Sequence, residues 1–188
     1  MNVNDYSFTF KSDCIVADNG KNVMMDWEHP IMKETANYIC QDGGDILELG
    51  YGMGISANYI QSHNINSHTI VECHPQILEN LYNWAKNKNN VIIIEGDWWK
   101  TRRHLKKYDG IFHDTWGGDE LSKIGYILPF IGKDNMKFSY FGNYSKDISI
   151  IGLKDEFSIT HKKINVNPPP NDYYNHNKYY MPKVEFNG

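Results

Sequence analysis

Cysteine is scarce in this sequence, and its few copies are scattered. There are three cysteines, Cys14, Cys40 and Cys73, and no two of them form a CxxC pair. Disulfide-stapled domains and structural zinc sites rely on paired, closely spaced cysteines, so both classes are disfavoured. The histidines also lack metal-ligand spacing, and we assign no metal. Scattered free thiols suit a reducing compartment, so we expect a cytoplasmic protein.

Long apolar runs and an excess of positive charge are also missing. No stretch of about 18 apolar residues is present that would span a bilayer, and the N-terminus lacks the basic-then-apolar pattern of a signal peptide. The formal net charge is −4 and the isoelectric point is near 6.0, which argues against nucleic acid as the main partner. We therefore expect a small-molecule partner, no membrane or nucleic-acid partner, and either a monomer or a homodimer.

What the sequence does contain is a regular alternation of apolar segments. Its 188 residues suit a single domain with one core. Strands are expected at 45–50, 68–73, 91–95, 108–115 and 137–142. Helices are expected at 26–40, 55–62, 75–86, 98–107 and 120–131. This order predicts an α/β fold with a Rossmann-like, doubly wound, mostly parallel sheet.

The two ends of the chain are less regular. Residues 1–23 are polar and weakly patterned, and we interpret them as a lead segment that can order over a ligand. Residues 145–153 have helical spacing. Residues 157–166 alternate like an edge strand, and residues 178–186 return as an antiparallel C-terminal strand. The Pro- and Asn-rich loop at 165–177 between them is a place where function is often found.

The strongest motif follows the first strand of the α/β region and opens a helix. It reads Glu48-Leu49-Gly50-Tyr51-Gly52-Met53-Gly54. Glycines allow a tight turn there and let backbone N–H groups approach a ligand without a Cβ atom in the way. The spacing differs from the G-x-G-x-x-G of dinucleotide binders, and Glu48 would repel a pyrophosphate. The motif therefore favours S-adenosylmethionine, with Glu48 attracting its cationic tail or ordering the loop; a plain tight turn is the alternative.

Two further strand ends extend the predicted cofactor site. Glu72 closes the second strand, about 20 residues after Gly50, where Rossmann-like folds place an acidic residue on the ribose hydroxyls. Gly96-Asp97-Trp98 ends the third strand. Asp97 is suited to accept a hydrogen bond from the adenine amine or to cap the following helix, and Trp98 is suited to cover the ring. The predicted cofactor set is Glu48, the loop 50–54, Glu72, Cys73, Gly96, Asp97, Trp98 and Asp114.

Taken together, these motifs resemble those of the guanidinoacetate N-methyltransferases. The similarity is carried by Trp27-Glu28-x-Pro30-x-Met32, LELGYGMG (47–54), VECHPQILENLYNWA (71–85), EGDWW (95–99) and YDGIFHDT (108–115). The resemblance implies a class I methyltransferase in which Glu28 and Asp114 clamp the guanidinium of the acceptor. The acceptor pocket that it implies is formed by Trp27, Glu28, Met32, Asp114, Thr115, Asn143, Tyr144 and Ser145. His113 and Asp97 depart from the family pattern, and the chain is shorter, so the acceptor stays open.

The chemistry of such an acceptor explains why carboxylates are needed. A guanidinium is a poor nucleophile because its lone pair is delocalised and the group stays protonated at neutral pH. Carboxylates pair with its N–H groups, offset the repulsion between two cations, and accept the proton released as the C–N bond forms. We assign Asp114 as the orienting residue and base, and Glu28 as the second clamp. Helix-capping and helix-dipole roles are the alternatives for these two residues.

Several functions remain open from the sequence alone. The first is methylation of a small, guanidinoacetate-like compound. The second is methylation of another acceptor, such as arginine, a small amine or a protein side chain. The third is a module that binds S-adenosylmethionine without catalysis. A nicotinamide-dependent oxidoreductase is disfavoured by the glycine spacing.

Overall fold

The computed structural model describes residues 3–116, 121–142 and 157–186. Its main sheet has seven strands in the order β6-β5-β4-β7-β8-β10-β9. Strands β4 to β8 pair in parallel, whereas β10 is antiparallel to both β8 and β9. The strands are β4 Asp45–Leu49, β5 Ser67–Glu72, β6 Val91–Glu95, β7 Tyr108–His113, β8 Gly132–Tyr140, β9 Phe157–Asn165 and β10 Lys178–Phe186. The doubly wound, mostly parallel sheet with an antiparallel C-terminal strand is confirmed.

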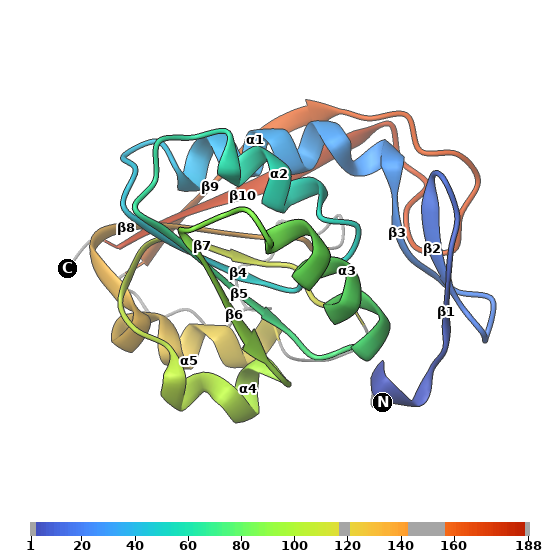
Figure 1. Ribbon diagram of the computed structural model, residues 1–188. Helices are drawn as coiled ribbons and strands as arrows, with labels where there is room; N and C mark the ends of the chain where they lie inside the picture. Colours follow the sequence, from blue (N-terminus) through green and yellow to red (C-terminus); the bar gives the residue numbers. More distant parts are fainter. Residues whose placement is uncertain (1–2, 117–120, 143–156, 187–188) are drawn as a thin grey trace.

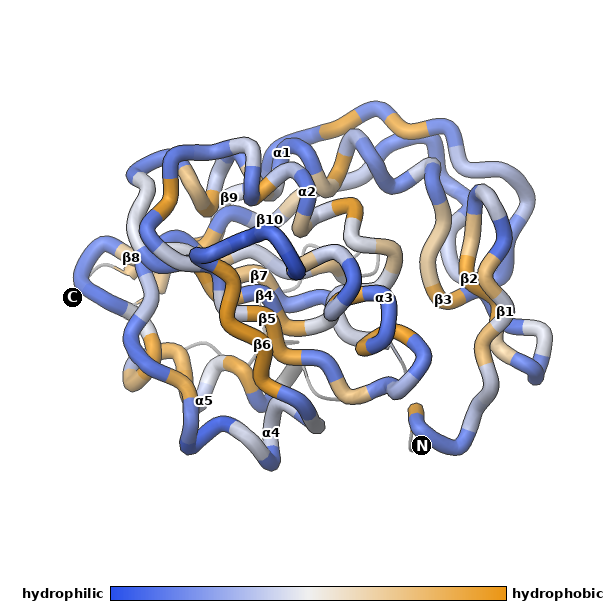
Figure 2. Tube along the Cα trace, in the orientation of Figure 1, coloured by the Kyte–Doolittle hydropathy of each residue, from blue (hydrophilic) through white to orange (hydrophobic). Residues whose placement is uncertain are grey.

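Helices cover both faces of this sheet (Figure 1). The upper face in that view carries α1 (His29–Ile39) and α2 (Ile55–Gln61), and the lower face carries α4 (Trp98–Thr101) and α5 (Leu121–Ile131). The helix α3 (Pro75–Ala85) follows β5 and packs with α2. Hydrophobic stretches follow the central strands, whereas most of the connecting turns are hydrophilic (Figure 2). This arrangement places the carboxyl ends of β4, β5, β6 and β7 at one edge, where open α/β sheets bind ligands.

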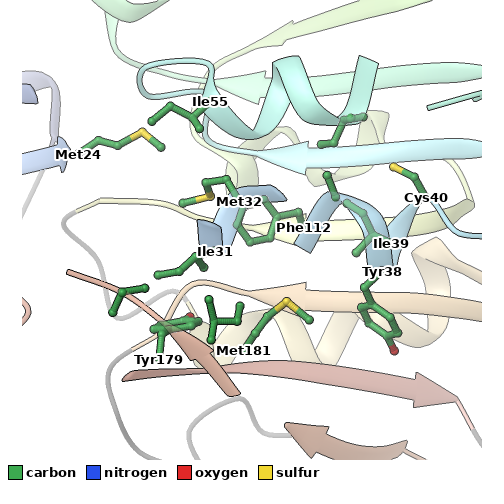
Figure 3. Close-up of a cluster of buried hydrophobic side chains, with 14 of the residues drawn as sticks. Met24, Ile31, Met32, Tyr38, Ile39, Cys40, Ile55, Phe112, Tyr179 and Met181 are labelled. Carbon is green, nitrogen blue, oxygen red and sulfur yellow. The ribbon is translucent and has the colours of Figure 1, made fainter. Parts of the chain in front are cut away.

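The alternation of side chains along β4 divides the core into two halves. Ile46 faces α1 and α2 in a cluster with Met32 and Phe112 (Figure 3), and Leu47 and Leu49 face α5 in a second cluster. Successive strand residues point to opposite faces of a sheet, so Glu48 shares the face of Ile46. The position of Glu48 therefore directs its carboxylate toward α2.

The helix α1 begins as the sequence indicated. A short 3₁₀ turn, η2 (Asp26–Glu28), leads into it, and Pro30 occupies its first turn, where a missing N–H costs nothing. The face with Ile31, Met32 and Ala36 is buried, because these residues recur at helical spacing. The start of α1 therefore fixes Glu28 at the edge of the sheet.

Residues 3–25 fold in a way that the sequence did not indicate. After a short 3₁₀ turn, η1 (Val3–Asp5), they form a three-stranded antiparallel sheet of β1 (Phe8–Phe10), β2 (Cys14–Ala17) and β3 (Asn22–Met25). The strands are three or four residues long, which is too short for a clear alternation pattern. Phe8 and Ile15 pack with α3 and with Tyr51, so this small sheet shares a hydrophobic cluster with the helices and the glycine loop of the large sheet.

Two other details of the prediction are wrong. The expected helix 98–107 ends early, because α4 covers four residues and then tightens into the 3₁₀ turn η3 (Arg102–His104). Trp98 is the buried residue of this segment, so no continuous apolar stripe supports a longer helix. The strand β6 is an edge strand with Ile92 exposed, although its apolar run predicted cover on both faces. The expected helix 145–153 lies outside the described residues.

Helices long and apolar enough to cross a bilayer are absent from the part of the chain that the structure describes.

Candidate active site

The glycine loop after β4 packs directly on the backbone that carries Asp114. Gly50 has φ +92°, and a Cβ atom there would lie 1.9 Å from the carbonyl oxygen of Asp114. The Asp114 N–H donates to the Leu49 carbonyl at 2.9 Å. Only glycine satisfies both the left-handed conformation and this close approach. The predicted cofactor loop and the predicted base are therefore held in one backbone arrangement.

The N-terminal sheet lies against the same loop. The Met53 N–H donates to the Met24 sulfur at 3.2 Å, and a Cβ atom on Gly52 would lie 2.6 Å from that sulfur. Tyr51 is buried beneath this contact. Met24 of β3, which directly follows the lead segment 1–23, thus contacts two of the predicted cofactor residues, Gly52 and Met53. Whether the lead segment covers a bound ligand stays a prediction.

Glu48 occupies the core rather than the surface of the loop. Its side chain is 0% exposed. One carboxylate oxygen accepts from the Ser56 hydroxyl, and the other pairs with His68 Nε2 at 2.9 Å. Ser56 stands in the first turn of α2. Of the two roles that we considered for Glu48, this geometry favours ordering the loop, because both oxygens are already engaged.

Glu72 ties the end of β5 to the glycine loop. One carboxylate oxygen accepts from the Tyr51 N–H at 3.0 Å, and the other accepts from the N–H groups of Cys73 and His74 at 2.7 and 2.8 Å. Three backbone donors hold an anionic side chain firmly in place. This carboxylate and the loop therefore form one unit at the carboxyl edge of the sheet, and contact of Glu72 with a ribose stays a prediction.

The end of β6 has a mixed arrangement. Asp97 caps α4, because its carboxylate accepts from the Lys100 N–H at 2.9 Å. Trp98 is 3% exposed and packs edge-on against His113, with ring centroids 5.3 Å apart. Burial lowers the pKa of His113 to about 4, so its ring is neutral. Among the described residues, neither Trp98 Nε1 nor His113 Nε2 has a hydrogen-bond partner.

Glu28 and Asp114 are two carboxyl groups that lie close enough for the charge of Glu28 to act on Asp114. Glu28 is 2% exposed, and burial raises its pKa to about 7. Removal of water also holds the pKa of Asp114 well above its usual range, with the charges of Glu28 and Glu48 acting in the same direction. A carboxyl group whose pKa is raised by burial and by a neighbouring carboxylate is well placed to receive a cation. The structure thus brings together two residues that lie far apart in the sequence.

A loop near the C-terminus completes this carboxyl pair. The Tyr173 hydroxyl donates to Glu28 Oε1 at 2.5 Å, and the Met25 N–H donates to the same oxygen at 2.8 Å. Trp27 stacks on Tyr174, with ring centroids 5.2 Å apart. The contact of Tyr173 with Glu28 was not predicted. The signal in the sequence was a tyrosine pair in a Pro- and Asn-rich loop, which does not specify a partner.

The remaining predicted acceptor residues fall into two groups. Met32 is 0% exposed and packs in the core cluster of Figure 3, so it contributes to the core beneath α1. Thr115 follows Asp114 and is partly buried, close to Gly50. Asn143, Tyr144 and Ser145 lie outside the described residues.

These residues fit S-adenosylmethionine by their own geometry. Gly50 brings the glycine loop against the Asp114 carbonyl oxygen at the carboxyl edge of the sheet, and Glu72 is fixed beside this loop. Trp98 Nε1 and His113 Nε2 are buried polar atoms without partners in the described part of the chain, and such atoms often mark a place for a ligand or ordered water. None of the described residues forms a cluster able to hold a metal ion.

Comparison with known families and sequences gives consistent matches. A family model described as guanidinoacetate N-methyltransferase matches residues 4–143. A protein named protein arginine N-methyltransferase 2, from Candida glabrata, is 31% identical over 94% of this chain and 50% of its own length. Its namesake from Saccharomyces cerevisiae is 29% identical over 94% of this chain and 51% of its own length. The chain thus spans about half the length of these relatives.

Solved structures share the fold at low sequence identity. A precorrin-6y C5,15-methyltransferase from Geobacter metallireducens superposes with a TM-score of 0.65 at 14% identity, covering 97% of this chain and 93% of that chain. The protein TYW2 from M. jannaschii, solved with AdoMet, gives a TM-score of 0.62 at 15% identity, covering 99% and 87%. At such identities the likeness establishes the architecture alone, which is that of Rossmann-like methyltransferases.

Proposed function

Because the chain belongs to the guanidinoacetate N-methyltransferase family of S-adenosylmethionine-dependent enzymes, we propose that it methylates a guanidino nitrogen held between Glu28 and Asp114. One observation carries this proposal: Glu28, at the start of α1, is buried, and its charge raises the pKa of Asp114, which follows β7 beside the glycine loop. A dry pair of acids is costly unless a cation compensates it. A guanidinium supplies both the charge and the hydrogen-bond donors.

Different residues of the site would bind the cofactor, orient the acceptor and accept its proton. The glycine loop and Glu72 would hold S-adenosylmethionine, which supplies an electrophilic methyl group when bound. Glu28 and Asp114 orient the planar guanidinium, because carboxylate oxygens accept hydrogen bonds from its N–H groups. Asp114, anchored beside Gly50, then accepts the proton that the nitrogen loses. Its raised pKa makes it a stronger base than a solvated aspartate once it is ionised.

The available support identifies the functional group of the acceptor, a guanidinium, but not the whole acceptor molecule. The family description names a small guanidino acid, and the relatives that match 94% of this chain are named for protein arginine. Both carry the same guanidinium, so the carboxyl pair serves either one. The relatives favour an arginine side chain, and the family description favours a small guanidino acid. Monomer or homodimer, and a cytoplasmic location, stay predictions.

The first test measures methyl transfer from labelled S-adenosylmethionine to guanidinoacetate, free arginine and an arginine-containing peptide. We expect transfer to at least one of them, and Asp114→Asn should lower kcat/KM by about 10²–10⁴-fold, the usual contribution of a general base. Glu79→Gln, which removes an exposed carboxylate on α3, is the matched control and should match the wild type.

Three outcomes of that experiment would contradict the proposal. The first is transfer to an acceptor without a guanidinium and to none of the three guanidino compounds. The second is full activity of Asp114→Asn. The third is tight cofactor binding without any transfer, which would favour the silent binding module.

A further inference from the structure

Three contacts join the C-terminal loop to the segment that carries Glu28. Asp172 accepts from the backbone N–H and the side-chain amide of Asn22, at 3.1 and 2.8 Å. Tyr173 donates to Glu28, and Tyr174 stacks on Trp27. Figure 1 shows this orange loop, between β9 and β10, reaching toward β2 and β3. Three consecutive residues of this loop thus contact the segment between Asn22 and Glu28, next to the carboxyl pair.

The two oxygens of Glu28 have different surroundings. Oε1 receives two hydrogen bonds, from the Met25 N–H and the Tyr173 hydroxyl. Among the described residues, no hydrogen bond reaches Oε2. The pKa of Tyr173 is raised by burial and by the charges of Glu28 and Asp114. The hydroxyl therefore keeps its proton at neutral pH and acts as a donor to the carboxylate.

We propose that Tyr173 is a positioning residue, which holds Oε1 of Glu28 and leaves Oε2 to bind the N–H groups of the acceptor. This inference rests on the proposed function, because it assigns the acceptor to the Glu28–Asp114 pair. A carboxylate fixed through one oxygen loses less rotational freedom when a guanidinium binds the other. Tyr173 touches neither reacting atom in this scheme and acts through Glu28.

The hydrogen bond from Tyr173 also favours the charged form of Glu28. Burial raises the pKa of Glu28, and the bonds from Tyr173 and Met25 lower it. Without the hydroxyl, one of the two hydrogen bonds that lower the pKa of Glu28 is lost, so burial raises that pKa further. A larger fraction of Glu28 is then protonated at neutral pH, and binding of a cationic acceptor needs a higher pH.

The chain offers a matched pair of variants for this test. Tyr173→Phe keeps the ring near Trp27, with centroids now 5.9 Å apart, and removes the hydroxyl on Glu28. Tyr174→Phe removes a hydroxyl from the adjacent residue, which donates to the Lys178 carbonyl. A general weakening of the loop would affect both variants, whereas only the Tyr173 hydroxyl, of the two that are removed, donates to Glu28.

The experiment has two readouts. In pH profiles of kcat/KM, Tyr173→Phe should move the acidic limb to higher pH and raise KM several-fold with a smaller change in kcat. Tyr174→Phe should leave the limb in place. Infrared titration of the protonated carboxyl band, assigned by its loss in Glu28→Gln, should show the same upward shift in Tyr173→Phe without any turnover.

These readouts separate the two proposals. An unchanged carboxyl midpoint in Tyr173→Phe, or an equal shift in Tyr174→Phe, would overturn the role of Tyr173. A shifted midpoint in Tyr173→Phe, together with a Glu28 band that no guanidino compound perturbs, would retain the Tyr173–Glu28 coupling, overturn its role in acceptor binding, and reject the proposed function.

Discussion

At the residue scale, burial of the Glu28 carboxyl group lowers the stability of the folded protein when the group is ionised. Glu28 is almost fully buried, and it is neither exposed to water nor paired with a cation among the described residues. A buried acid without a cationic partner raises its pKa instead of ionising. Sites tuned for binding or catalysis often carry such destabilising groups. The pair therefore has a measurable consequence for stability.

We expect the ionisation of Glu28 to destabilise the folded protein as the pH rises. Its pKa is about 7 when folded and 4.5 for an unperturbed glutamate, so the folded state holds the proton more tightly. The resulting stabilisation is complete below pH 4.5 and is lost as the pH rises through 7. The shift corresponds to about 3 kcal/mol.

Chemical denaturation of wild type and Glu28→Gln between pH 5 and 8 measures this effect. Glutamine retains the acceptor oxygen but has no charge to desolvate, so the variant should gain stability relative to wild type as the pH rises. Parallel pH profiles for the two proteins would contradict the assignment. Asp114 has its pKa raised in the same direction and adds to the slope in both proteins.

At the element scale, the glycine loop shows how a turn couples two sites. Gly50 follows β4, has a left-handed backbone conformation and touches the Asp114 carbonyl oxygen at the end of the neighbouring strand β7. A change in the loop therefore alters both the predicted cofactor surface and the backbone of the predicted base.

Gly50→Ala should disrupt this element far more than a comparable change elsewhere. Gly20 is a control with φ +83° and no atom within 4 Å of the place a Cβ atom would take, whereas Gly50 has φ +92° and an oxygen at 1.9 Å. Gly20→Ala should cost about 1 kcal/mol from its left-handed conformation alone. Gly50→Ala should lose that amount and also at least tenfold in affinity for S-adenosylhomocysteine by calorimetry. Equal affinity in the two variants would contradict the coupling.

Elements with a strong local signal could be predicted from the sequence. Strand β6 and helix α3 lie within a residue or two of their expected bounds, because an apolar run and a Pro-initiated amphipathic helix specify themselves locally. The N-terminal sheet could not be predicted, since its short strands owe their burial to α3 and the glycine loop. The reach of Tyr173 to Glu28 spans 145 positions, and only the fold reveals it.

At the scale of the whole molecule, three separate parts of the chain meet at one edge of the sheet. The N-terminal segment supplies Glu28 and Met24, the central strands supply the glycine loop and Asp114, and the C-terminal loop supplies Tyr173. The roles of Glu28 and Asp114 were predicted from the sequence through its family resemblance. Their electrostatic coupling and the engagement of Glu48 in the core required the fold.

Calorimetric binding of a guanidino compound to the protein–S-adenosylhomocysteine complex tests the central claim most directly. Guanidinoacetate and an arginine peptide would be titrated into wild type, Glu28→Gln and Asp114→Asn, each already saturated with S-adenosylhomocysteine. We expect at least one compound to bind wild type, and each variant to lose tenfold or more in affinity for that compound, about 1.4 kcal/mol. Glu28→Gln should keep the wild-type affinity for S-adenosylhomocysteine. Equal binding of that compound to wild type and both variants would show that the carboxyl pair does not hold the guanidinium.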